Sequence, residues 1–157
     1  TLYIAPSHDE LSAEGHLYMD DGQTFAYRDD QAFLARKFTL TRDGPGHLRL
    51  ASTSLTGRDI HTSASSTALQ VPGNAYEQET SSVRVERIIV YGLPEVHRII
   101  ARDAHGHETS LAFTYTSGTS RSPTASDASA RLASRLEIRD PRVLIGQDWS
   151  ILMEIAP

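Results

Sequence analysis

The chain has 157 residues and a formal net charge of −5, and these properties exclude several classes of protein. Its 15 Lys and Arg residues are scattered among 20 Asp and Glu, so no basic surface for nucleic acid is expected. No apolar run approaches the roughly 20 residues that cross a bilayer, so membrane insertion is not expected. Because the chain has no cysteine, it has neither internal disulfides nor a thiolate metal site. Its length fits one domain with a substantial hydrophobic core.

The first six residues, TLYIAP, alternate apolar and other side chains as a strand does. Because this alternation starts at Thr1, we expect the chain to begin inside a strand. We therefore predict that residues 1–7 are the last strand or linker of a preceding domain. Residues 8–157 would then form the domain itself.

The stretch 15–27, GHLYMDDGQTFAY, predicts a complete β-hairpin. Asp21-Gly22 between two apolar runs favours a type I′ turn, which would pair Tyr18 with Phe25. Both faces of this hairpin would be apolar, so we expect each face to be covered, one of them by a loop or a neighbouring domain. The two faces carry, in order, Tyr18, Phe25 and Tyr27, then Leu17, Met19 and Ala26.

Turn residues separate further strand-like runs along the rest of the chain. A second hairpin is expected at 33–41 and 47–54, and a third at 96–103 and 107–116. Additional strands are expected at 83–91, at 135–139, at 143–145 and at 149–155. In the first of these, the change from alternation to a continuous apolar run suggests a bulge near Arg87 or a strand that becomes buried on both sides. Two Ser/Thr-rich stretches, about 56–82 and 117–134, are predicted to be flexible loop insertions. The fold class predicted is all-β: an antiparallel β-sandwich, jelly-roll-like, with under about a tenth of its residues helical.

No catalytic, cofactor-binding or metal site is predicted from the residues themselves. Adjacent Asp20 and Asp21 point in different directions, so they suit a turn better than a glycosidase acid pair. His105 and His107 have no acid or third histidine at useful spacing, so they are expected to be solvated turn residues. Trp149 and the tyrosines could form a sugar-stacking platform, but their alternating strand positions favour the core.

Three segments, in order along the chain, resemble segments of glycoside hydrolase family 31. The run 17–25, LYMDDGQTF, followed by Tyr27 and by FLARKF at 33–38, is similar to a hairpin near the family's C-terminus. VERIIVYG at 85–92 resembles a later strand, and DWSI at 148–151 resembles the closing motif of the endoplasmic-reticulum branch. The two Ser/Thr-rich stretches fall between these segments and are outside the resemblance.

This resemblance implies a non-catalytic part of a larger enzyme. Family members are retaining α-glucosidases whose catalytic aspartates lie in a (β/α)₈ barrel, and this chain would be the distal C-terminal β-sandwich that supports it. Its implied partners are the remaining polypeptide, with the barrel and a proximal β-sandwich, and a regulatory β subunit. The assembled enzyme would remove terminal α-1,3-linked glucose from N-linked high-mannose glycans in the endoplasmic reticulum lumen. No cofactor is implied.

A second reading comes from a different class of function. The chain could be a free-standing β-sandwich that binds carbohydrate or protein. Such a module should begin in a linker, whereas this chain is expected to begin inside a strand. The strand-like start at Thr1 therefore favours the enzyme fragment.

Overall fold

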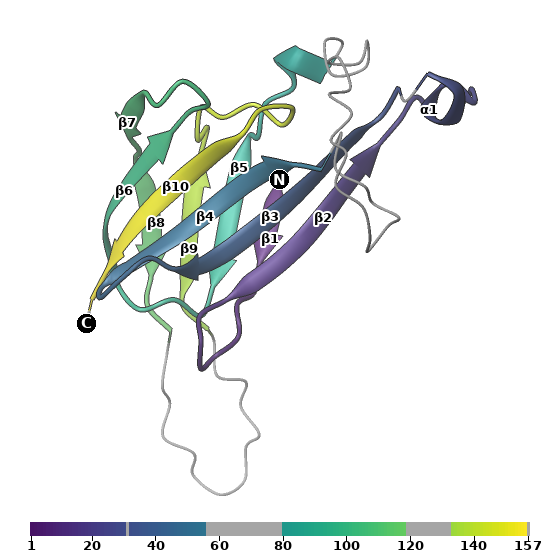
Figure 1. Cartoon of the computed structure of the whole chain (residues 1–157). Helices are drawn as coiled ribbons and strands as arrows, with labels where there is room; N and C mark the ends of the chain where they lie inside the picture. Colours follow the sequence, from purple (N-terminus) through teal and green to yellow (C-terminus); the bar gives the residue numbers. More distant parts are fainter. Residues whose placement is uncertain (31, 56–79, 119–132, 157) are drawn as a thin grey trace, which may run out of the picture.

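The computed structural model describes residues 1–30, 32–55, 80–118 and 133–156, which form two β-sheets packed face to face (Figure 1). The smaller sheet has the strand order β1-β5-β9-β8 and the larger has the order β2-β3-β4-β10-β6-β7. The predicted β-sandwich is therefore confirmed. The predicted insertions at about 56–82 and 117–134 lie largely outside the described residues. No helix in the described part of the chain is long and apolar enough to cross a membrane.

The chain passes back and forth between the two sheets, with up to three consecutive strands in one sheet. The smaller sheet contains β1 (Leu2–Ile4), β5 (Arg87–Tyr91), β8 (Phe113–Thr116) and β9 (Arg135–Arg139). The larger sheet contains β2 (Ala13–Met19), β3 (Leu34–Arg42), β4 (His47–Ser54), β6 (Val96–Arg102), β7 (Glu108–Ser110) and β10 (Trp149–Ile155). Two short helical segments complete the described chain, α1 (Ala26–Asp29) and the 3₁₀ turn η1 (Thr80–Ser82).

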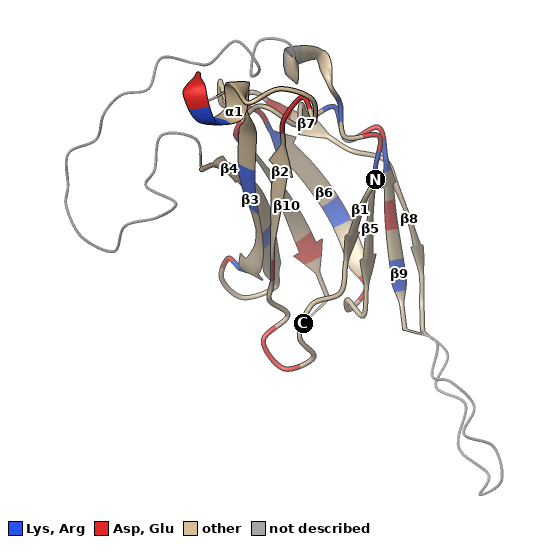
Figure 2. Cartoon of the chain, turned by 90° about the vertical axis from the view of Figure 1, so that its right-hand side faces the viewer, with Lys and Arg blue, Asp and Glu red and all other residues tan. Residues whose placement is uncertain are grey.

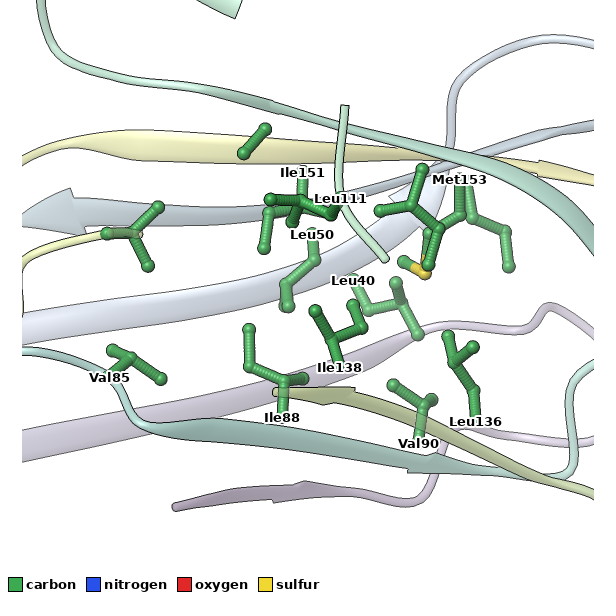
Figure 3. Close-up of a cluster of buried hydrophobic side chains, with 14 of the residues drawn as sticks. Leu40, Leu50, Val85, Ile88, Val90, Leu111, Leu136, Ile138, Ile151 and Met153 are labelled. Carbon is green, nitrogen blue, oxygen red and sulfur yellow. The ribbon is translucent and has the colours of Figure 1, made fainter. Parts of the chain in front are cut away.

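The core lies between the sheets and consists of the alternate residues that face inward (Figure 3). In β10 the alternation is complete, because Trp149, Ile151, Met153 and Ile155 are all buried. From the smaller sheet the fully buried residues are Ile88, Val90, Leu136 and Ile138, and from β3 and β4 they are Leu34, Leu40, Leu48 and Leu50. The alternating burial in β10 confirms the prediction that 149–155 forms a closing strand with one buried face.

The second predicted hairpin is confirmed and the third is confirmed in part. Strands β3 and β4 pair antiparallel with Leu40 opposite Leu50. Strand β6 pairs with β7 across the predicted turn, but β7 ends at Ser110 and β8 joins the other sheet. The run 107–116 is thus two strands rather than one, and buried Leu111 lies where the chain crosses between the sheets.

The first predicted hairpin is wrong. Strand β2 does not pair with residues 23–27 but with β3, so that Tyr18 lies opposite Ala35 instead of Phe25. A type I′ turn needs positive φ at two successive residues, and here Gly22 has φ +61° while Asp21 is not among the positive-φ residues. The connection between the strands is therefore a longer loop, 20–33, that contains α1.

Strand β1 pairs parallel with β5, with Tyr3 opposite Ile89, whereas the prediction was of antiparallel strands. Leu2 and Ile4 pack partly against the core, so this chain itself provides part of the cover that we expected from another polypeptide. The assignment of residues 1–7 to a preceding domain stays a prediction. Strand β5 begins at Arg87 and pairs with β9 in continuous register, so the predicted bulge is wrong. Its residues 88–90 are all buried, which confirms the alternative of a strand buried on both sides. Before Arg87, Val83 and Val85 bond to the backbone of Val143 and Ile145 instead.

A buried arginine joins the strands of the larger sheet. Arg36 on β3 is 1% exposed, and its guanidinium donates hydrogen bonds to Ser52 Oγ at 3.0 Å and to Asp148 Oδ1 at 2.7 Å. It also donates to the backbone carbonyl of Gln147. Asp148 accepts a further bond from the Ser54 backbone N–H at 2.9 Å. Because a buried charge is costly unless it is paired and hydrogen-bonded, this network holds the start of β10 against β3 and β4.

We expect Arg36→Lys to lower the free energy of unfolding by about 1–3 kcal/mol, because an ammonium group cannot reproduce the guanidinium's fork of donors. Urea denaturation would measure the loss. Arg49→Lys is the matched control, since half-exposed Arg49 pairs with Asp43 alone on the same sheet. Its effect should stay within about 0.5 kcal/mol. Equal losses in the two variants would show that the buried network does not stabilise the fold.

Candidate interaction surface

The two aspartates at 20 and 21 organise the loop that follows β2. Asp20 Oδ1 accepts the Gly22 N–H at 2.9 Å, and Asp21 Oδ1 accepts the Gln23 and Thr24 N–H groups at 3.1 and 3.0 Å. The Thr24 hydroxyl donates to Asp21 and accepts the Ala26 N–H at 3.2 Å, at the start of α1. Both aspartates are turn residues, as predicted. Their side chains, rather than a type I′ backbone turn, hold the loop together.

The pKa of Asp21 lies below its ordinary value. The causes are the hydrogen bond from the Thr24 hydroxyl, followed by those from the backbone N–H groups of Thr24 and Gln23. These donors stabilise the ionised carboxylate. Asp21 is therefore suited to holding a loop together rather than to donating a proton.

His105 and His107 lie in a turn as predicted, but the expectation that no acid lies near them is wrong, because Asp103 contacts His107. The rings of His105 and His107 lie 6.1 Å apart, and Asp103 Oδ1 accepts the backbone N–H of both residues at 2.9 Å. His107 Nδ1 is 3.1 Å from Asp103 Oδ2. Within residues 1–30, 32–55, 80–118 and 133–156, no three His, Asp or Glu side chains are grouped to hold a metal ion.

The aromatic residues divide into a buried set and an exposed set. Trp149 is 4% exposed, packs 6.0 Å from the Phe38 ring, and donates its Nε1–H to the Leu144 carbonyl. It is therefore a core residue, as its alternation predicts. The core prediction is wrong for Tyr3, Tyr18 and Tyr27, which are 69%, 53% and 38% exposed.

Four rings gather around the loop 20–33 and form what we call the aromatic surface: Tyr18, Phe25, Tyr27 and Phe33. Tyr18 stacks on Phe33 with ring centroids 5.4 Å apart, and Phe25 lies 6.3 Å from Tyr27. Phe25 is 64% exposed, and the Arg28 guanidinium lies 5.1 Å from its ring centroid. The sequence predicted that a loop or a neighbouring domain would cover these rings. Within the described part of this chain, no such cover is present. The contribution of Phe33 was not predicted, because pairing β2 with residues 23–27 would have placed Phe33 elsewhere.

A groove of about 290 Å³ runs along the open side of the sandwich, between the edge strands β1 and β2. We call it the edge groove. Its walls are mainly apolar and include Leu2, Ile4, Leu17, Phe38 and Leu40. Neither strand has a partner on its outer edge among the described residues, so both present backbone groups beside apolar side chains. The aromatic surface and the edge groove share strand β2 (Figure 1).

Comparisons with known proteins find α-glucosidases. The chain is 25% identical over 151 residues to neutral alpha-glucosidase AB of Homo sapiens, and equally so to that of Sus scrofa. The alignment covers 96% of this chain but 12% of each relative, so the chain spans about an eighth of their length. No family model matches. The predicted resemblance to an α-glucosidase is thus confirmed by proteins aligned along nearly the whole chain.

Solved structures agree on the fold. A glucosidase II alpha subunit bound to Glc1Man2 superposes with a TM-score of 0.65 at 24% identity, covering 96% of this chain and 14% of that one. An ER glucosidase II heterodimer, consisting of a catalytic subunit and the binding domain of a regulatory subunit, gives 0.66 at 23% identity. At this identity the match shows that the sandwich fold is shared with part of these enzymes.

Asp21→Asn tests the role of the loop carboxylate. Because the folded-state pKa of Asp21 is depressed, its ionised form stabilises the fold above the ordinary aspartate pKa. That contribution is lost as the pH falls through the folded-state value. We expect the unfolding midpoint of Asp21→Asn to lie below that of wild type at neutral pH. The difference between the two midpoints should shrink in acid. Thermal unfolding over this pH range measures it, with exposed Asp9→Asn, which removes a contact only to the adjacent His8, as control. A difference independent of pH would contradict the role of the charge.

Gly22→Val should lower the free energy of unfolding by at least roughly 1 kcal/mol, because a β-branched residue is strained at φ +61°. A Cβ at this position would meet no atom within 4 Å, so the loss would come from the backbone alone. Gly15→Val is the matched control, since Gly15 has equal space on β2 without a positive φ. Chemical denaturation of both variants measures the difference. An unchanged midpoint for Gly22→Val would mean that the loop adopts another conformation.

Proposed function

We propose that this chain is the distal C-terminal β-sandwich of a glycoside hydrolase family 31 α-glucosidase similar to the glucosidase II alpha subunit. The observation that carries the proposal is the alignment of 96% of the chain, in sequence and in fold, with a small part of such enzymes. In this role the sandwich supports a (β/α)₈ barrel that holds the catalytic aspartates. The chain itself contributes no catalytic residue.

The arrangement of carboxylates in the described residues supports the non-catalytic role. Two glycosidase carboxylates must face each other across a cleft, roughly 5 to 10 Å apart. Asp20 and Asp21 are neighbours in the chain and are occupied by the backbone of their own loop. Glu14 is held by Lys37 at 2.8 Å and Glu137 by arginines at 2.7 and 2.8 Å. These four carboxylates thus serve structure.

The substrate and the partners belong to the assembled enzyme in this proposal. That enzyme would hydrolyse terminal α-1,3-linked glucose from N-linked high-mannose glycans in the endoplasmic reticulum lumen. A regulatory β subunit is the proposed second partner, because a similar catalytic subunit has been solved with the binding domain of its regulatory subunit. The first partner is the remaining polypeptide, with its barrel and its proximal β-sandwich.

The aromatic surface and the edge groove are the proposed contacts with that polypeptide. Burying one large apolar side chain contributes on the order of 1.5 to 3 kcal/mol. Phe25 and Tyr18 are more than half exposed here, so covering them would stabilise a docked arrangement. We expect an interface of at least roughly 1,000 Å² in total.

The competing function is a free-standing module that binds carbohydrate. The exposed rings of the aromatic surface favour it, because aromatic faces stack on sugars as well as they pack against protein. Such a module would fold as a cooperative monomer and bind glycans without another polypeptide. Glycan binding by the purified 157-residue chain, lost in Phe25→Ser, would establish this alternative.

Activity gives one test of the proposal. We expect the purified 157-residue chain to show no turnover of any α-glucoside, because the residues that the structure describes offer no convergent acid pair. A chromogenic α-glucoside assay measures this. Turnover that survives purification and disappears in Asp20→Asn or Asp21→Asn would overturn the non-catalytic role.

Docking gives a second test. The chain should co-purify with the remaining polypeptide of its α-glucosidase, produced without this segment. We expect the double variant Tyr18→Ser/Phe25→Ser to reduce the recovered complex at least about tenfold, since the lost burial is worth more than the 1.4 kcal/mol that a factor of ten requires. Val83→Ser is the matched control, because Val83 is a 41% exposed apolar residue outside both surfaces. Equal recovery of complex for the wild-type chain, the double variant and Val83→Ser would show that the contact lies outside the aromatic surface.

A further inference from the structure

The outer face of the smaller sheet carries three arginines around one glutamate, and we call this cluster the basic face. Arg135, Glu137 and Arg139 alternate on β9, and Arg87 lies opposite Arg139 on neighbouring β5. The alternating residues Leu136 and Ile138 point into the core, so these four side chains point away from it. Figure 2 shows basic and acidic positions together on β9.

All three arginines contact the same carboxylate. Arg139 Nε lies 2.8 Å and Arg87 Nε 3.3 Å from Glu137 Oε1, and an Arg135 Nη lies 2.7 Å from Glu137 Oε2. The glutamate side chain is 6% exposed, whereas the arginines are 41%, 38% and 74% exposed for Arg87, Arg135 and Arg139. The carboxylate is therefore covered, and the guanidinium groups around it face solvent.

The charges in this cluster do not balance. Burial raises the pKa of Glu137, but hydrogen bonds from Arg139 and Arg135 and their positive charges outweigh it, so the pKa lies below its ordinary value. Glu137 is thus ionised at neutral pH, and the cluster keeps two surplus positive charges on a chain of net charge −5. On the larger sheet, by contrast, Arg49 pairs with Asp43 and Arg102 with Glu108. One guanidinium would neutralise Glu137, so the other two are available to a ligand.

The shape of the basic face favours an extended ligand. Arg135 and Arg139 are four residues apart on one strand, which separates their backbones by roughly 13 Å. Tyr91 lies opposite Arg135, and the 69% exposed ring of Tyr3 lies on β1 of the same sheet. Each guanidinium has five N–H donors, most of them unused by Glu137, and carboxylates match this fork geometry. A row of donors beside aromatic rings suits several carboxylates in succession better than one phosphate.

We propose that the basic face binds an acidic segment of a separate protein chain. Permanent interfaces are more apolar than this charged face, and arginine and tyrosine are enriched at protein interfaces relative to the rest of a protein surface. The arginines of this site lie outside the aromatic surface and the edge groove, which the site meets at Tyr3, and the proposal does not depend on the proposed enzyme.

The test is binding of a fluorescein-labelled peptide of about ten glutamates, which when extended spans roughly 33 Å and so covers the arginine row. We expect saturable binding to the 157-residue chain, measured by fluorescence anisotropy at low salt and weakened as salt rises. The variant Arg87→Gln/Arg139→Gln leaves Arg135 to pair with Glu137 and should weaken binding at least about tenfold, because it removes both surplus positive charges of the cluster. The control Arg49→Gln/Arg102→Gln makes the same change in charge on the larger sheet and should change the affinity less than about twofold.

Three further measurements separate the effects of charge, folding and ligand class. Arg87→Lys/Arg139→Lys should retain peptide binding if the positive charges account for it. If Arg87→Gln/Arg139→Gln fails to fold, Arg139→Gln alone should still weaken peptide binding. Absence of peptide binding, or equal losses in the two glutamine variants, would overturn the proposal. Preferential binding of a heparin fragment, double-stranded DNA or inorganic phosphate over the peptide would also overturn it, because the ligand would then be another kind of anion.

Discussion

A charged side chain in the middle of a hydrophobic sandwich constrains the structure more than any apolar contact does. Arg36 is tolerated because Ser52, the Gln147 carbonyl and Asp148 together satisfy its guanidinium. Apolar side chains can exchange neighbours at small cost, whereas this group needs its partners in one arrangement. Since Asp148 directly precedes β10, the arginine determines where that strand begins and therefore that Trp149 enters the core.

The two candidate surfaces lie on different sheets and differ in chemistry. The aromatic surface adjoins β2 and β3 of the larger sheet and offers exposed rings, with Arg28 over Phe25 and paired with Asp29. The basic face lies on β5 and β9 of the smaller sheet and offers charge around Glu137. Apolar contact suits an association that persists, and a surface of charges suits one that depends on ionic strength. One sandwich of this size can therefore serve two partners at once.

Periodicity predicts the parts of this fold in which neighbours in sequence are partners in space. The alternation of β10 and the pairing of Leu40 with Leu50 could be derived because one face of each strand is buried. The first hairpin could not, because the Asp21 side chain binds backbone N–H groups that a tight turn would have left to the strands. Nor does any local pattern indicate that Phe33 stacks on Tyr18, or that three arginines share Glu137. Those arrangements depend on strand order, which residue patterns do not specify.

The strand order also has a consequence for how the chain is made. β10 follows every other strand in the sequence, yet it lies between β4 and β6 at the centre of the larger sheet. As the chain leaves the ribosome, β2-β3-β4 and β6-β7 can form only as separate ribbons, each with an unpaired edge toward the missing strand. Exposed edges of this kind pair readily with other chains, and pairing between distant segments is slow. A nascent chain of this fold is thus exposed to aggregation through these edges until β10 inserts.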